Sequence, residues 1–203
     1  MIKLNIPISE TDILSLKVGD EVSLNGILVT GRDVAHKYII EHFVKTTPEG
    51  EDKKLFDKLQ KYLNQGVIYH CGPVVSEDNG KYSFIAAGPT TSIREEPYQA
   101  DVIKCFGLRG VIGKGGMGDK TIKACEENKS VYFHAVGGAA ALIAKSVKEV
   151  LDVEKLDFGT PEAFWIIRVE DFPCVVTIDS HGNSLHKEIQ AKSKIKLDEI
   201  LSL

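Results

Sequence analysis

Closely spaced cysteines, long hydrophobic runs and an excess of positive charge are all missing from this chain. The four cysteines, Cys71, Cys105, Cys125 and Cys174, stand singly, and no Cys-x-x-Cys pair occurs. A zinc ribbon or a self-contained iron–sulfur site uses such pairs, and the six histidines show no metal-type spacing either. We therefore expect free, buried thiols and no metal site built by this chain alone.

The charge balance and the hydropathy argue against further classes of protein. With 25 basic and 29 acidic residues the net charge is −4, which disfavours a general nucleic-acid binder. No apolar run reaches the roughly 18 residues of a membrane span, and the first residues lack the core of a signal peptide. We expect a soluble, cytoplasmic protein without nucleic-acid or membrane partners. At 203 residues and 43% hydrophobic, the chain is expected to form a single domain, residues 1–203.

The chain divides into a β-rich first half and a second half in which strands and helices alternate. Apolar residues at period two predict the strands, and apolar residues three and four apart predict the helices. The first half is expected to hold an extended arm (1–15), β structure (18–30) with turns at 19–20 and 25–26, a helix capped by Asp33, a helix (54–63), a hairpin of 66–75 and 81–87 around Asn79-Gly80, and a helix (97–106). The second half is expected to hold strands at 108–112, 131–136, 163–169 and 173–179, and helices at 119–129, 137–150 and 184–201. This order predicts an α/β fold with mixed β/β/α layers and βαβ units.

Two loops, residues 87–96 and 109–118, combine glycines with hydroxyl and cationic side chains. The first loop carries Thr90, Thr91 and Arg94, and the second carries Lys114. Each follows an apolar run, 82–87 or 111–112, that we interpret as a buried strand. Glycine lets the backbone approach a ligand, and cations beside free N–H groups bind anions. An anion site is one interpretation, and an ordinary turn and loop are the other.

The second loop also matches, formally, a nucleotide-binding pattern. Gly113-Lys-Gly-Gly-Met-Gly118 has the Gly-x-Gly-x-x-Gly spacing between a predicted strand and a predicted helix. The next strand, however, ends near Val136 without an acidic residue for a ribose, and a lysine lies inside the loop. A P-loop is also disfavoured, because Gly115 follows Lys114 where that motif has Ser or Thr.

A small dicarboxylate accounts for more of these residues than a nucleotide does. Arg32, Arg94 and Lys114 are three cations in three loops that we expect at the ligand-binding edge of an α/β sheet. An arginine can pair with a carboxylate through two hydrogen bonds, and a lysine supplies a compact charge. A local surface pair between Arg32 and Asp33 is the alternative for Arg32.

Five motifs, in order and over nearly the whole chain, resemble the β subunit of class I fumarate hydratases. The L-tartrate dehydratase β subunit carries the same motifs. They are Gly31-Arg-Asp-Val-Ala-His36, Gly88-Pro-Thr-Thr-Ser-Ile-Arg94, Gly110-Val-Ile-Gly-Lys-Gly-Gly-Met117, Gly137-Gly-Ala-Ala-Ala-Leu142 and Ile178-Asp-Ser-His-Gly-Asn183. One departure is Glu95-Glu96, where the family pattern has Met-Glu. We expect that difference to be minor, with an effect on substrate choice left open.

The resemblance implies a fold, a partner and residue roles that spacing does not show. The fold would be the swivelling β/β/α domain of the C-terminal part of single-chain class I fumarases. A partner α subunit, in a heterodimer or heterotetramer, would hold a [4Fe–4S] cluster through three cysteines, and the open iron would act as a Lewis acid on the substrate hydroxyl. By motif, Arg32, Arg94 and Lys114 would bind the substrate carboxylates and Thr90 would be the catalytic base. His36 and Asp33 would support or cap rather than bind.

The resulting hypothesis is the β subunit of an iron–sulfur hydro-lyase that interconverts fumarate and (S)-malate. L-tartrate dehydratase is the alternative within the same enzyme class, because tartrate adds only one hydroxyl to the same dicarboxylate frame. A non-catalytic module that binds a dicarboxylate or assists assembly is the alternative from another class. For Thr90, a structural cap of the turn after Pro89 is the alternative to a base.

Overall fold

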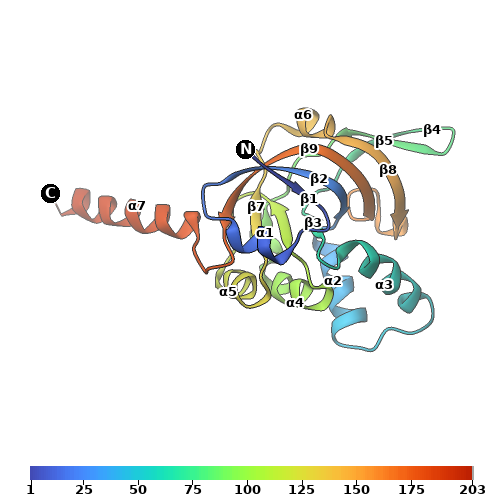
Figure 1. Cartoon of the computed structure of the whole chain (residues 1–203), viewed down its shortest axis with the longest axis horizontal. Coiled ribbons are helices and arrows are strands. Elements are labelled where there is room, and N and C mark those ends of the chain that lie inside the picture. Colours follow the sequence, from blue (N-terminus) through green and yellow to red (C-terminus); the bar gives the residue numbers. More distant parts are fainter. Residues whose placement is uncertain (203) are drawn as a thin grey trace.

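A computed structural model describes residues 1–202, and one mixed β-sheet organises it (Figure 1). Its seven strands lie in the order β1-β2-β3-β6-β7-β9-β8, and β9 pairs with β2 as well. Strands β2, β3, β6, β7 and β9 therefore close into a ring, while β1 and β8 extend it. The bounds are β1 (Ile2–Asn5), β2 (Glu21–Thr30), β3 (Val67–Tyr69), β6 (Gly110–Gly113), β7 (Val131–His134), β8 (Val147–Glu154) and β9 (Phe164–Ile178). A separate hairpin contains β4 (Val74–Asp78) and β5 (Lys81–Ala86).

Four helices cover one face of the sheet, at the lower side of Figure 1. They are α2 (Asp33–Ile39), α3 (Gly50–Leu63), α4 (Glu96–Phe106) and α5 (Asp119–Asn128). The short helices α1 (Glu10–Ser15) and α6 (Ala140–Ala144) lie elsewhere, α2 continues into a π-helical turn (Ile40–Val44), and single 3₁₀ turns span Ser92–Glu95 (η2) and Leu156–Phe158 (η3). The α/β fold with a mixed sheet and helices on one side is confirmed.

The sheet separates two hydrophobic clusters, because successive side chains of a strand point to opposite faces. Tyr69 and Phe133 pack into the cluster on the strand side, whereas Ile68 and Tyr132 pack against the helices. On the strand side, fully buried Trp165 of β9 meets Tyr82 and Phe84 of the hairpin edge-to-face, at centroid distances of 5.0 and 5.8 Å. Such aromatic contacts fix the hairpin over the sheet.

The direction of the central strands decides where a ligand site can form. Strands β2, β3, β6 and β7 run parallel to one another, so their carboxyl ends meet at one edge of the sheet. Loops that follow these ends are therefore neighbours in space, although they are far apart in the sequence.

Two predicted elements in the second half are wrong. The helix predicted at 137–150 ends at Ala144, and residues 147–154 form β8. Register shifts between Val147 and Glu149 and between Val150 and Asp152 interrupt the alternation of β8, so its apolar residues imitate helical spacing. The two strands predicted at 163–169 and 173–179 are one strand, β9, in which Asp171 adopts a positive φ of 49°.

Smaller corrections concern the first half. The arm predicted at 1–15 contains β1 and the helix α1, which Ser9 caps. The turn predicted at Asn25-Gly26 is a bulge inside β2, where Gly26 has φ +126° and a Cβ would lie 2.7 Å from the Ile6 carbonyl oxygen. Helix α2 begins one residue earlier than predicted, because Arg32 rather than Asp33 is its N-cap. The run at 82–87 is not a buried strand, since exposed and half-buried residues alternate along β5.

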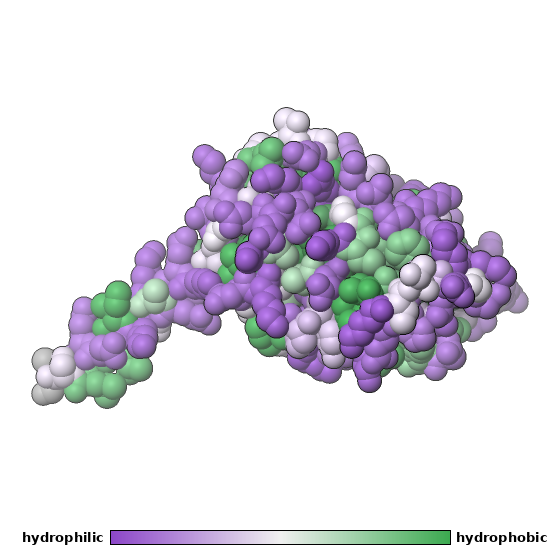
Figure 2. Space-filling view, turned by 90° about the horizontal axis from the view of Figure 1, so that it is seen from below, coloured by the Kyte–Doolittle hydropathy of each residue, from purple (hydrophilic) through white to green (hydrophobic). Residues whose placement is uncertain are grey.

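The last helix, α7 (Leu185–Leu201), stands away from the body (Figures 1 and 2). Residues 184–201 were predicted to be helical, and this is confirmed, with Ser184 as the N-cap. Figure 2 shows hydrophobic as well as hydrophilic residues on it; Ile189, Ile195 and Leu197 are among the exposed ones. Within residues 1–202, no helix combines the length and the apolar composition needed to cross a membrane.

Candidate functional site

The two loops singled out in the sequence lie side by side at the carboxyl edge of the sheet. Thr91 forms a parallel bridge with Lys114, which follows β6, and the Ser92 amide donates to the Lys114 carbonyl at 3.0 Å. Pro89 forms an antiparallel bridge with Cys71, which follows β3. The segment that contains Thr90 is therefore held between the ends of β3 and β6.

Thr90 is fixed to the backbone at the end of β3. Its amide and its hydroxyl both donate to the His70 carbonyl oxygen, at 2.7 and 3.2 Å. Its side chain is half-buried. Because the hydroxyl donates in this bond, its oxygen can still accept a hydrogen bond from a ligand. No carboxylate or imidazole in residues 1–202 is hydrogen-bonded to it. The geometry suits both a turn cap and a residue that faces a substrate.

Arg32 lies next to this segment, beside Gly72. A Cβ on Gly72 would lie 2.5 Å from the Arg32 Nη1 atom, so a larger residue there would displace the guanidinium from this position. The Arg32 Nε atom forms an ion pair with Glu162 at 3.3 Å, and the other Glu162 oxygen accepts from the Val34 amide at 3.1 Å. The predicted local pair of Arg32 with Asp33 is not what the structure shows.

Asp33 instead pairs with Arg94, which projects from η2. Both predicted carboxylate-binding arginines are thus held by acidic side chains of the same chain. Lys114 differs, because its ammonium group forms no ion pair within the part of the chain that the structure describes. Its aliphatic stem runs over Gly137, where a Cβ would lie 3.5 Å from the Lys114 Cδ atom.

A fully buried polar network lies beneath these loops, and the sequence analysis missed it. The His36 Nε2 and His70 Nε2 atoms both contact the Gln99 side-chain amide, at 3.0 and 2.7 Å. The His70 Nδ1 atom and the Tyr132 hydroxyl both contact Ser92 Oγ at 2.8 Å. The network joins α2, β3, α4, η2 and β7 under the ligand edge.

The histidines of this network are neutral. Burial lowers the pKa of His36, and burial together with the neighbouring His36 lowers the pKa of His70 to about 3. The His36 Nδ1 atom lies 2.9 Å from the Arg32 carbonyl oxygen and must donate to it, so the Nε2 atom accepts. The Gln99 Oε1 atom lies at both Nε2 atoms, and the Gln99 NH₂ group is buried without a partner. Because the His36 Nε2 atom accepts, we infer the reversed amide orientation, in which the NH₂ group donates to both rings.

Gly113 allows this network to lie close under the second loop. A Cβ at Gly113 would lie 1.8 Å from Ser92 Oγ and 2.8 Å from the Tyr132 hydroxyl. A signal for the network existed in the sequence, because His70 stands at the end of an apolar strand directly before Cys71 and Gly72. Its partners, Ser92 and Gln99, carry no such signal.

The nucleotide-like loop does not leave an open phosphate site at the N-terminus of α5. The Glu96 carboxylate accepts from the amides of Gly118, Lys120 and Thr121 at 2.8, 3.0 and 3.3 Å, and from the Thr121 hydroxyl at 2.7 Å. These are the donors that would otherwise receive a phosphate. The chain's own carboxylate occupies that position, which agrees with the sequence arguments against a nucleotide site in this loop.

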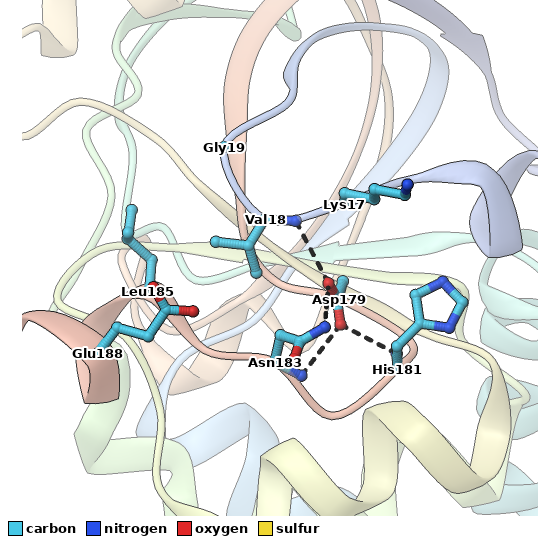
Figure 3. A pocket seen from close by; sticks show the side chains of 8 residues that line it. All are labelled: Lys17, Val18, Gly19, Asp179, His181, Asn183, Leu185 and Glu188. Atoms are coloured by element: carbon cyan, nitrogen blue, oxygen red, sulfur yellow. Dashed lines mark hydrogen bonds between the residues drawn. The ribbon is translucent and has the colours of Figure 1, made fainter.

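The motif 178–183 lies at the opposite edge of the sheet, in the pocket of Figure 3. Asp179 accepts from the amides of Val18, His181 and Asn183 and from the Asn183 side chain, at 3.3, 3.0, 3.0 and 3.0 Å. Because β9 runs antiparallel to β2 and β7, this turn lies at the amino ends of these strands, whereas Arg32 and Lys114 follow the carboxyl ends of β2 and β6. The dashed bonds in Figure 3 show a carboxylate that closes a turn onto the N-terminal segment.

The cysteines offer no set of metal ligands. Three are buried and one is partly buried, and each lies in a different part of the fold, at residue 71 after β3, 105 in α4, 125 in α5 and 174 in β9. Burial raises the pKa of Cys71 and of Cys125 to about 12, so both thiols are protonated. Within residues 1–202, no group of three or more His, Cys, Asp or Glu side chains could hold a metal ion.

Known proteins resemble this chain over most of its length. Residues 1–189 match the family described as "Fumarase C-terminus". Over 200 residues the chain is 50% identical to a Geobacillus stearothermophilus protein assigned as a class I fumarate hydratase, covering 98% of this chain and 36% of that protein. It is 41% identical over 198 residues to a Methanocaldococcus jannaschii protein assigned as L(+)-tartrate dehydratase subunit beta, covering 97% and 96%. It is 37% identical over 186 residues to the L(+)-tartrate dehydratase subunit beta of Escherichia coli, covering 91% and 86%.

Proposed function

The chain belongs to the fumarase C-terminus family, and we propose that it is the β subunit of a hydro-lyase acting on a small dicarboxylate. It spans only 36% of the fumarate hydratase relative, whereas it covers nearly all of one tartrate dehydratase β subunit. In this proposal a separate α subunit supplies the rest of the enzyme. Fumarate and (S)-malate are the proposed substrates.

The observation that carries the proposal is the convergence of cations and a hydroxyl at one sheet edge. The ends of β2 and β6 are followed by Arg32 and Lys114, and Thr90 is hydrogen-bonded to the end of β3. Arg94 lies beside them because it forms an ion pair with Asp33, the residue after Arg32. Two guanidinium groups and one unpaired ammonium group suit two carboxylates separated by a short carbon frame. The ion pairs of Arg32 and Arg94 keep both side chains in place and are exchanged for substrate carboxylates on binding.

Exposed hydrophobic residues around the site support docking of a partner there. Val34 lies two residues after Arg32, and Ile93 directly precedes Arg94. Val136 precedes Gly137 under Lys114, and Leu142 lies on α6, whose Ala140 contacts Gly88. Their exposed fractions are 42%, 51%, 60% and 64%. Exposed hydrophobic side chains beside a group of charged residues are typical of a protein–protein interface. We infer that the α subunit covers this edge and closes the site.

A [4Fe–4S] cluster in this proposal belongs to the α subunit, since the buried thiols of the β chain do not fit one. The β chain binds both carboxylates and presents Thr90 to the carbon that loses its proton. An alcohol is a weak base and needs an activating group. The Thr90 hydroxyl contacts only the His70 carbonyl within residues 1–202, so we propose that a carboxylate of the α subunit activates it.

L-tartrate dehydration is the second candidate. The two relatives named as tartrate dehydratase β subunits match this chain in length as well as in sequence, with 96% and 86% of their residues covered. Anaerobic copurification with the α subunit, followed by assays on malate, fumarate and L-tartrate, distinguishes the candidates. Copurification without turnover of any of the three would favour a binding or assembly module instead.

Substitution of Thr90 tests its proposed role. Thr90→Val keeps the shape and is expected to lower kcat on the order of 10²–10⁴-fold, whereas Thr90→Ser retains part of the activity. A turn cap would instead lower the melting temperature and leave kcat largely intact. Normal turnover and normal solvent deuterium exchange into malate by Thr90→Val would exclude Thr90 as the base.

A further inference from the structure

Glu95 is a buried carboxyl group at the carboxyl edge of the sheet to which the proposed function assigns no role. It ends η2, directly after Arg94, and is 1% exposed. Its Oε2 atom is buried without a hydrogen-bond partner. A buried carboxylate normally accepts several hydrogen bonds, so an unpaired oxygen here points either to a proton on the group or to a missing ligand.

The charged groups around Glu95 belong to the proposed site. The charges of Asp33 on α2, Arg94 on η2 and Arg32 after β2 act electrostatically on Glu95, and Tyr132 of β7 is also within electrostatic reach. Helix α4 begins with Glu96, whose carboxylate accepts hydrogen bonds from the N-terminus of α5. The pKa of Glu95 is raised to about 7, mainly because the group is buried and to a smaller extent because Asp33 is negatively charged. The positive charges of Arg94 and Arg32 oppose this shift.

The protonation state of Glu95 decides the net charge of the site. Arg32, Arg94 and Lys114 are opposed by Asp33 and Glu162. The site therefore carries one net positive charge when Glu95 is neutral and none when Glu95 is ionised. A doubly charged ligand meets an attractive field only in the first case, and the interior weakens Coulomb interactions far less than water does.

We propose that the neutral carboxyl group of Glu95 is the form that admits the dicarboxylate, so that this residue sets the pH range in which the substrate binds. The inference rests on the proposed function and deepens it. Ionised Glu95 would repel a substrate carboxylate through the protein interior, whereas neutral Glu95 would not. Substrate binding and retention of the Glu95 proton are then coupled, because each favours the other.

Kinetics against pH test the proposal in the complex with the α subunit. KM for the dicarboxylate is expected to rise about tenfold per pH unit above neutrality, as the neutral fraction of Glu95 falls. Glu95→Gln, which cannot ionise, is expected to abolish this rise, and Glu95→Asp to retain a rise. The matched control is Glu77→Gln, an exposed residue of β4, which keeps the wild-type profile. A wild-type KM profile in Glu95→Gln would overturn the proposal.

A second measurement does not depend on turnover. Carbon-13 NMR of glutamate-labelled chain, assigned by difference from Glu95→Gln, follows the Glu95 carboxyl with and without succinate, an unreactive dicarboxylate. We expect titration near neutrality and a shift to higher pH on saturation with succinate. Titration in the ordinary glutamate range, or no response to bound succinate, contradicts the inference. Absence of turnover on every dicarboxylate, with the expected Glu95 shift, would refute the proposed enzyme function and leave the binding role intact.

Stability against pH gives a further readout. A raised pKa means that the folded chain binds this proton more tightly than the unfolded chain does. Its contribution to stability is therefore complete below about pH 4.5 and lost as the pH rises through about 7. Glu95→Gln should accordingly gain melting temperature relative to wild type at pH 8 but not at pH 4.5. An equal difference at both pH values would show that Glu95 does not titrate in this window.

Discussion

Removal of the Glu96 carboxylate is expected to destabilise the protein and loosen the loop that carries Lys114. Glu96→Ala deletes four hydrogen bonds to the first turn of α5, two of them to Thr121, which is fully buried. Loss of a capping group costs about 1 kcal/mol, and the favourable contact of a negative charge with a helix N-terminus adds roughly 0.3–1 kcal/mol. Buried donors left without an acceptor cost about 1–3 kcal/mol more.

These contributions overlap, so we expect a total loss of roughly 2–4 kcal/mol in the free energy of unfolding. For a chain of this length, 1 kcal/mol corresponds to about 2–4 °C in melting temperature, which predicts a decrease of roughly 5–15 °C. Glu96→Gln keeps one acceptor oxygen and should lie between alanine and wild type. Glu127→Gln, an exposed position of the same helix, is the control and should change the melting temperature little.

Calorimetry or thermal circular dichroism of the chain measures the effect. Because the Lys114 carbonyl accepts from the Ser92 amide, a loosened loop should also raise KM for the dicarboxylate in the assembled enzyme. A decrease of less than about 2 °C in Glu96→Ala would refute the view that this carboxylate holds the N-terminus of α5.

Two further predictions concern the site and the cofactor. Lys114→Met or Arg94→Met should lower kcat/KM by an amount that corresponds to a loss of transition-state stabilisation on the order of 2–5 kcal/mol. Arg94→Lys should also be a poor enzyme, because lysine cannot form the two parallel hydrogen bonds of arginine. Exposed Lys104→Met on α4 is the control, and near-normal kinetics of both Met variants would refute the carboxylate-binding interpretation. The chain purified alone and anaerobically should be folded, colourless and inactive; stoichiometric iron and sulfide on it, or hydration of fumarate without a partner, would contradict the assignment of the cluster to the α subunit.

Elements whose signal lies within a few adjacent residues were predictable. Helices α3, α4 and α5 and the Asn79-Gly80 turn follow local periodicity and turn chemistry, and the structure places them within a few residues of the prediction. The placement of Arg32 and Lys114 at one edge also followed from sequence, because loops after parallel strands share an edge. Their roles in binding stay predictions.

Elements that depend on a distant partner were not predictable. Strand β8 exists because β9 offers it an edge, and its register shifts hide the two-residue period. The bulge at Gly26 likewise depends on the close approach of Ile6 across the sheet. In each case the local pattern favoured another structure, and pairing with a remote segment decided the outcome.

The candidate site shows the same division. The sequence alone determined which cations, hydroxyls and glycines the ligand loops carry, since those are properties of single residues and short motifs. Only the tertiary structure decided that Glu162 and Asp33 pair with the arginines, that Glu96 caps α5 and that Glu95 is buried without a partner. Charge, burial and hydrogen bonding at a site are sums over groups from several elements, and folding brings those groups within reach of one another.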